Sequence, residues 1–119
     1  MKNFALVIED DEDLSNIFVK ALQAAGFEVE PIRDGQTAKK RLGEVVPQVI
    51  VLDLHLPHIS GGTLLKQIRG TEALNTTRII IATADAEQAE KYRNQATIVM
   101  VKPISYSQLR DISARLRIE

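Results

Sequence analysis

The chain of 119 residues has the length of one compact domain, and 45% of its residues are hydrophobic, enough to form a core. Its formal net charge of −1 gives no electrostatic reason to expect a nucleic acid or a membrane as partner. The absence of cysteine excludes disulfides and thiolate chemistry. The first apolar run, residues 4–8, is too short for a signal peptide, and no run could span a bilayer, so we expect a cytoplasmic protein.

Apolar runs divide the chain into alternating strands and helices. The apolar runs at 4–8, 49–52, 78–82 and 98–101, together with the alternating segment 28–32, predict five strands. The run before Asp53 is apolar throughout, which is typical of a strand buried on both faces of a parallel sheet. Pro31 cannot donate to a strand ladder, so we expect the second strand at an edge of the sheet.

A helix is predicted after each strand, over about 14–25, 35–44, 62–70, 85–94 and 106–117. The first has an apolar stripe at helical spacing, formed by Leu14, Ile17, Phe18, Ala21, Leu22 and Ala25. Asp11 or Asp13 is expected to cap its start, and Gly26 to end it in a left-handed conformation. The fourth helix has a poor apolar pattern and is expected to be short. Ser105 or Ser107 is expected to cap the fifth.

Five strand–helix repeats predict a single α/β domain over residues 1–119, with a parallel sheet covered by helices on both faces. With the second strand at an edge, the flavodoxin-like, doubly wound order 2-1-3-4-5 fits. In that order ligands bind between the first and third strands, at the carboxyl ends of the strands.

Residues whose side chains can bind a metal ion or a phosphoryl group follow four of the five strands. Glu9 and Asp10 follow the first strand, Asp53 the third, Thr83 the fourth and Lys102 the fifth. Three neighbouring carboxylates raise each other's pKa unless a cation compensates, and Mg²⁺ is commonly held by carboxylates together with a phosphate. An aspartate beside Mg²⁺ can accept a phosphoryl group, whose oxygens the Thr83 hydroxyl and the Lys102 ammonium can contact.

Each of these residues also has an ordinary structural interpretation. Alone, Asp53 would be a turn residue, Thr83 a structural hydroxyl and Lys102 a solvated strand end. Only their convergence favours phosphoryl chemistry. Within the acidic run, we assign Glu9 and Asp10 to the metal and residues 11–13 to the helix start.

Other charged residues are expected to face solvent. His55 and His58 share a loop without further nitrogen or thiolate ligands, which does not favour a metal site of their own. The basic run 39–41 is interpreted as the exposed face of the second helix.

The chain resembles the receiver domain of the two-component response-regulator family, in its chemotaxis-type single-domain layout. The matching segments follow the family's order and span essentially the whole chain: Glu9-Asp10, Asp53 with Leu56-Pro57, Gly61, Thr83-Ala84 and Lys102-Pro103.

The resemblance implies a Mg²⁺ site and a phosphoacceptor. Asp53 would accept the phosphoryl group and also bind the metal. Asp10 would bind Mg²⁺ directly, Glu9 through water and His55 through its main-chain carbonyl. The metal ligands are thus expected to be Glu9, Asp10, Asp53 and His55.

The resemblance also implies the contacts of the phosphate. Thr83 would touch a phosphoryl oxygen, Lys102 would pair with the phosphate, and the Lys102-Pro103 bond would be cis. The donor would be a histidine kinase or a histidine phosphotransfer protein. The domain would catalyse only its own phosphorylation and dephosphorylation, and His55 and Asp85 would tune the lifetime of the phosphoryl group.

Departures from the family pattern concern the output. The aromatic residue that usually couples to Thr83 would fall at Val99, and Ser60 replaces the usual acid before Gly61. Tyr92 or Tyr106 could supply the missing aromatic ring. These changes leave the phosphorylation chemistry intact and make a non-switching interaction module the alternative function.

No output domain is expected after the fifth helix. The chain would then be either a complete protein that signals by docking a partner or relaying phosphate, or a fragment that has lost its effector domain. Two other classes of protein fit the sequence less well. A haloacid-dehalogenase-type phosphatase would need a second acid at His55 and a cap domain. A flavin-binding protein would need a hydroxyl- and glycine-rich phosphate loop where this chain has acids.

Overall fold

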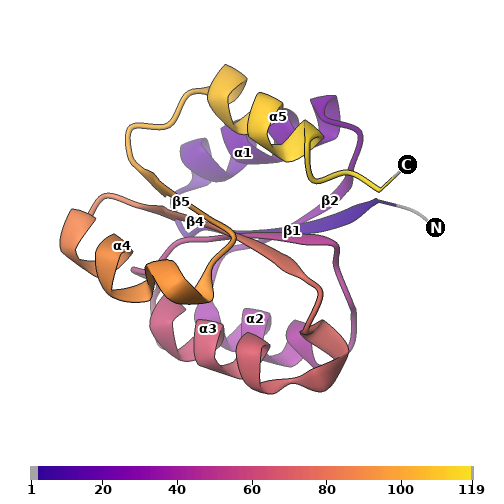
Figure 1. Cartoon of the computed structure of the whole chain (residues 1–119). Helices are drawn as coiled ribbons and strands as arrows, with labels where there is room; N and C mark the ends of the chain where they lie inside the picture. The colour runs from indigo at the N-terminus through magenta and orange to yellow at the C-terminus, as the bar shows by residue number, and fades with distance from the viewer. Residues whose placement is uncertain (1–2, 119) are drawn as a thin grey trace.

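The computed structural model describes residues 3–118, which form a five-stranded parallel sheet (Figure 1). The strands are β1 (Phe4–Ile8), β2 (Glu28–Ile32), β3 (Val49–Leu52), β4 (Arg78–Thr83) and β5 (Ile98–Val101). Their order across the sheet is β2-β1-β3-β4-β5, so the predicted flavodoxin-like fold is confirmed. Strand β2, which contains Pro31, lies at an edge as predicted.

Helices cover both faces of the sheet (Figure 1). They are α1 (Glu12–Ala24), α2 (Gly35–Leu42), α3 (Gly61–Gly70), α4 (Ala86–Tyr92) and α5 (Tyr106–Ala114). Helices α1 and α5 pack together on one face, and α2 and α3 on the other. Helix α4 contacts β4 and β5, next to the open edge of the sheet.

The inner residues of the central strands are apolar because each face of the sheet has its own core. Leu6, Ile50 and Ile79 point to the core under α2 and α3. Val7 and Ile80 point to the core under α1 and α5. All five are fully buried, and burial of a large aliphatic side chain contributes about 1.5–3 kcal/mol. This packing holds the carboxyl ends of the strands at one rim.

The helix ends follow local signals. Asp11 caps α1 by accepting a hydrogen bond from Leu14 N at 2.9 Å. Gly26, two residues beyond α1, has a φ of 101°, the predicted left-handed conformation. Ser105 caps α5 and forms a reciprocal capping box with Gln108.

Three helices are shorter than predicted. Helix α2 ends at Leu42, with Gly43 as its C-cap, and α4 ends at Tyr92 and continues as a 3-10 turn, Arg93–Gln95. Helix α5 ends at Ala114 rather than near residue 117. Beyond it, the main chain of Ile118 pairs with the side chain of Asn3, which draws the tail to the start of β1. A 3-10 turn at Glu72–Leu74 was not predicted.

Two expectations about exposure were wrong. Ile17, placed on the buried stripe of α1, is 40% exposed, since the sheet and α5 cover only the side that carries residues such as Phe18. Lys39 and Lys40 are exposed as expected, but Arg41 is half-buried. Its guanidinium binds both carboxylate oxygens of Glu30 on β2, at 2.7 and 2.9 Å. Within residues 3–118, no helix has the length and apolar character needed to cross a membrane.

Candidate functional site

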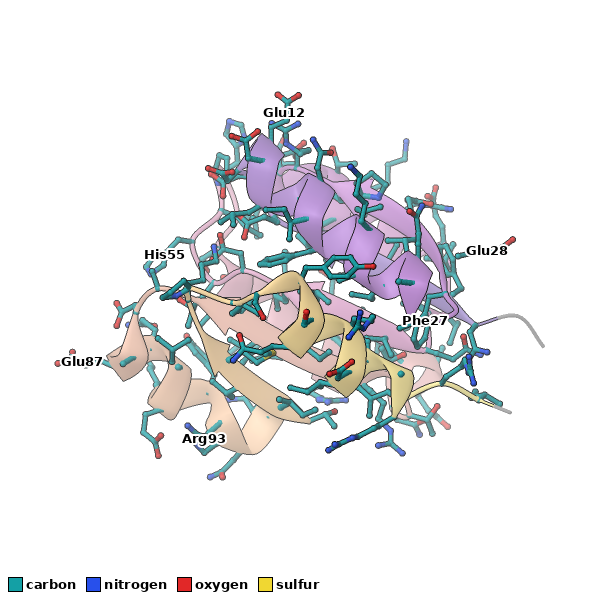
Figure 2. The ribbon with its side chains drawn as sticks, turned by 90° about the horizontal axis from the view of Figure 1, so that it is seen from above. Glu12, Phe27, Glu28, His55, Glu87 and Arg93 are labelled. Atoms are coloured by element: carbon teal, nitrogen blue, oxygen red, sulfur yellow. The ribbon has the colours of Figure 1, made fainter. Side chains whose placement is uncertain are left out.

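The polar residues predicted to converge lie together at the carboxyl ends of the strands. Figure 2 shows His55, which follows β3, at the same end of the molecule as Glu12, the first residue of α1. Glu28, the first residue of β2, lies at the opposite end. The site therefore occupies the rim at the switch point between β1 and β3.

Asp53 is held at the end of β3 by its own main chain and by the following loop. Its N–H donates to Ile8 O at 3.0 Å, which continues the β1–β3 ladder, and its Oδ1 accepts from His55 N at 3.0 Å. Helix α3 begins directly against this segment: a Cβ on Gly61 would lie 3.0 Å from the carbonyl carbon of Asp53. Any larger residue at Gly61 would displace the backbone that carries Asp53.

Lys102 links two of the carboxylates. Its Nζ donates to Glu9 Oε1 at 2.7 Å and to Asp53 Oδ2 at 3.4 Å. Glu9 is 1% exposed and Asp53 4%, so both contacts lie in a partly dehydrated site, where they are stronger than at the surface. The other Glu9 oxygen accepts from Asp11 N at 3.1 Å.

Burial raises the pKa of Glu9 to about 7, and the charge of Asp53 acts in the same direction. The hydrogen bonds from Lys102 and from the Asp11 main chain oppose this increase only in part. For Lys102, burial alone would lower the pKa, but the hydrogen bond to Glu9 and the charges of Asp53 and Glu9 outweigh it and the pKa is raised. Lys102 therefore stays charged across the physiological range.

Three carboxylates of the site can serve one cation. An oxygen from each of Glu9, Asp10 and Asp53 lies within 4.8 Å of the other two. Glu9 and Asp53 are buried, whereas Asp10 is exposed at the mouth. A set of carboxylate oxygens open to water suits Mg²⁺, which prefers oxygen ligands and retains several waters.

Thr83 and Asp85 line the side of the site formed by β4. Thr83 is fully buried, and its Oγ1 accepts a hydrogen bond from Asp85 N at 3.2 Å. The carboxylate of Asp85 lies 3.8 Å from Nε2 of His55, across the mouth of the site. His55 and His58 are both exposed, as predicted.

The residues that the family resemblance associates with switching differ in burial and in the elements they pack against. Val99 is half-buried and packs, together with Tyr92, against the core under α2 and α3. Tyr106 is 38% exposed, at the start of α5. Of the two tyrosines, Tyr92 is thus the one that packs against the same core as Val99. Pro103 is exposed, and its bond to Lys102 is cis, as the family resemblance implies.

Sequence reasoning missed Arg33. Its Nε donates to the main-chain oxygen of Asp10 at 3.1 Å, and its guanidinium lies 3.9 Å from the Glu12 carboxylate. Arg33 follows β2, and nothing in the local sequence marks it as a partner of the acidic loop. Only the pairing of β1 with β2 brings it there.

Comparison with known proteins identifies the class that this fold and site define. The family model of the response regulator receiver domain matches residues 5–114. The chain belongs to this family: it is a receiver domain of the two-component response-regulator type. Receiver domains of this type interact with histidine kinases or phosphotransfer proteins.

Individual relatives agree with this assignment. The phosphate regulon transcriptional regulatory protein PhoB of Rhizobium meliloti is 39% identical over 106 residues, which cover 87% of this chain and 47% of PhoB. The chain thus spans about half the length of that relative. The chemotaxis response regulator CheY4 of Vibrio cholerae superposes with a TM-score of 0.87 at 25% identity, covering 98% of this chain and 100% of CheY4.

A third structure is similar in fold. It is the receiver domain of a sensor histidine kinase from Pseudomonas aeruginosa, described with a magnesium ion in its active-site cleft. The TM-score is 0.85 at 24% identity, and the superposition covers 98% of both chains.

Proposed function

We propose that Asp53 accepts a phosphoryl group from a histidine kinase or a histidine phosphotransfer protein. The observation that carries this proposal is the position of Lys102, whose ammonium lies between the carboxylates of Glu9 and Asp53. In the transfer, an Asp53 oxygen attacks phosphorus, the phosphorus–nitrogen bond of the phosphohistidine breaks and the imidazole leaves. Positioning and charge neutralisation then account for most of the rate.

Mg²⁺ is the cofactor that the donor set fits. Asp10 and Asp53 would bind it directly, Glu9 through water and His55 through its main-chain carbonyl. When bound, Mg²⁺ neutralises charge on the phosphoryl oxygens. The clustering of three carboxylates supports this assignment, as does the magnesium in the fold-related Pseudomonas receiver domain.

Lys102 and Thr83 would hold the transferred group. The Lys102 ammonium already touches Asp53 Oδ2, so a short movement away from Glu9 would bring it to a phosphoryl oxygen. The Thr83 hydroxyl now accepts from Asp85 N and keeps its own hydrogen as a donor for the phosphoryl group.

The whole chain, residues 1–119, would act as one cytoplasmic receiver domain that passes the signal on by a change of conformation or by binding an effector. The alternative is a receiver-like module that binds partners without switching. Val99 favours that alternative, because valine has no ring to swing between two positions.

The proposal is tested by intact-mass measurement after incubation with acetyl phosphate, with and without Mg²⁺. We expect one phosphoryl adduct that requires Mg²⁺ and is lost in Asp53→Asn. The matched control is Asp111→Asn, an acid-to-amide change on the exposed side of α5, which should keep the adduct.

The outcomes separate the two functions. An adduct accompanied by changes in amide chemical shifts at Val99 and α4 supports the switching receiver. An adduct without shifts beyond the rim supports a phosphorylated module that does not switch. If the folded protein forms no adduct and still binds Mg²⁺, the phosphoacceptor role of Asp53 is wrong.

A further inference from the structure

A polar pocket lies at the rim of the sheet opposite the phosphoacceptor site, at the amino ends of β3 and β4. Its volume is about 380 Å³, within the range of small-molecule sites, and its walls come from the segments before β3 and β4 and after α5. The side chains that matter here are Arg78, Arg115, Arg117, Val46, Leu116 and Ile118. Arg78 and Thr83 are the first and last residues of β4, so the pocket and the phosphoacceptor site lie at opposite ends of that strand.

The walls of the pocket carry three arginines. No aspartate or glutamate lines it within residues 3–118. Arg117 interacts with other groups of the chain, so Arg78 and Arg115 are the two guanidiniums assigned to a ligand. In the described part of the chain, neither of these guanidiniums has a carboxylate within ion-pair distance. Two such guanidiniums favour an anion, because each can bind a carboxylate or a phosphate with two parallel hydrogen bonds.

The same pocket exposes apolar surface. Val46 is 59% exposed and Ile118 45% exposed. They are two of the five large hydrophobic side chains that are exposed in the described chain, and Leu116 adds a half-buried face beside them. A ligand that covered these side chains would remove apolar area from water in addition to pairing with the arginines.

Hydrogen bonds between its segments hold the walls of the pocket in place in the ligand-free protein. The side-chain amide of Asn3 donates to Ile118 O at 2.9 Å and accepts from Ile118 N at 2.6 Å, which holds the tail after α5. Gln48 N donates to Phe4 O at 2.8 Å, and Arg78 N to Gln48 O at 2.9 Å. A preformed pocket loses less entropy when a ligand binds.

We infer that this pocket binds a small organic anion, a carboxylate or a phosphate group carried on an apolar body. The anionic group would pair with Arg78 and Arg115, and the apolar body would lie on Val46, Leu116 and Ile118. The inference is independent of phosphoryl transfer at Asp53, which lies on the other rim.

Amide chemical-shift titration of the metal-free full chain tests the inference with four probes at constant ionic strength. Benzoate and phenylphosphonate carry both features, acetate only the charge, and benzyl alcohol only the ring. We expect saturable shifts at Arg78, Arg115 and Leu116 with benzoate, phenylphosphonate or both, and at least tenfold weaker binding of acetate and benzyl alcohol. Comparison of the first two probes decides between carboxylate and phosphate.

The variant Arg78→Gln with Arg115→Gln should weaken binding of the better probe by about tenfold or more, since charge-assisted hydrogen bonds are lost. The control, Lys20→Gln with Lys66→Gln, removes the same charge from exposed positions on α1 and α3 and should leave the affinity within about twofold. Urea unfolding checks that both variants fold. Non-saturating shifts, or equal affinity in the arginine variant, would overturn the inference.

Discussion

At the scale of single residues, Glu9 shows how position changes the chemistry of an ordinary side chain. Its carboxyl group is 1% exposed at the end of β1, and burial raises its pKa to about 7. The neighbouring Lys102 ammonium compensates only in part. Without a metal, the folded protein therefore binds a proton at Glu9 that the unfolded chain releases near pH 4.5.

This linkage predicts a pH-dependent stability in EDTA. Because the folded-state pKa of Glu9 lies above its unfolded value, the folded state binds the extra proton between pH 4.5 and about 7. The Glu9 contribution to the free energy of unfolding is complete below pH 4.5 and declines as the pH rises through 7, by about 3 kcal/mol at most.

The measurement compares urea unfolding of the wild type and Glu9→Gln at pH 5 and pH 7.5. Glutamine resembles the protonated acid and does not titrate, so the difference between the two proteins isolates Glu9. We expect the wild type to lose stability relative to the variant at the higher pH. A difference that is constant across this range would contradict the raised pKa.

At the scale of elements, one aromatic side chain brings α4 into contact with α3. The ring of Tyr92, at the end of α4, lies directly over Gly62 in the first turn of α3. A Cβ at Gly62 would lie 2.8 Å from Cζ of Tyr92. The preceding residue, Gly61, lies against the backbone of Asp53. The contact of Tyr92 with α3 is therefore one residue away from the contact of α3 with the candidate phosphoacceptor.

We predict that Gly62→Ala destabilises the protein by about 1–2 kcal/mol, because an overpacked contact costs about 1–3 kcal/mol and the better helix propensity of alanine returns less than 1 kcal/mol. In a Tyr92→Ala background the ring is gone, and the same change should be neutral or stabilising. Urea unfolding of the four proteins measures this coupling. Equal effects of Gly62→Ala in both backgrounds would show that the ring does not rest on Gly62.

At the scale of the whole molecule, the parallel sheet separates charge. It gathers Glu9, Asp10 and Asp53 at one rim and leaves Arg78 and Arg115 at the other. The three carboxylates at the first rim repel one another, so a divalent cation that binds between them should stabilise the folded protein relative to the unfolded chain.

We therefore predict that Mg²⁺ at ten times its dissociation constant raises the free energy of unfolding by about 1.4 kcal/mol, and that EDTA reverses the gain. Asp10→Asn should lose most of this gain, since it removes one ligand. It should not be less stable than the wild type in EDTA, because it also removes a repelling charge. Thermal unfolding with and without Mg²⁺ provides the test, and an equal gain in Asp10→Asn would exclude Asp10 as a ligand.

Sequence patterns were informative wherever a local rule acts alone. Apolar runs located four strands, and the alternation over 28–32 located the fifth, with Pro31 identifying it as the edge strand. Each of the two predicted pairs of capping residues, Asp11 or Asp13 and Ser105 or Ser107, contained the residue that caps the helix. Helix ends were predicted less well. The end of α5 depends on a long-range contact between Asn3 and Ile118, which no local pattern encodes.

The sequence by itself determined the alternation of strands and helices and the rim on which Glu9, Asp53, Thr83 and Lys102 meet, because the carboxyl ends of parallel strands share one edge. Only the tertiary structure decided the contacts between those residues and the pKa of Glu9, since both depend on burial and on distances of a few ångströms between segments far apart in the chain. The seating of Tyr92 on Gly62 and the arginine-lined pocket likewise arise from packing across elements.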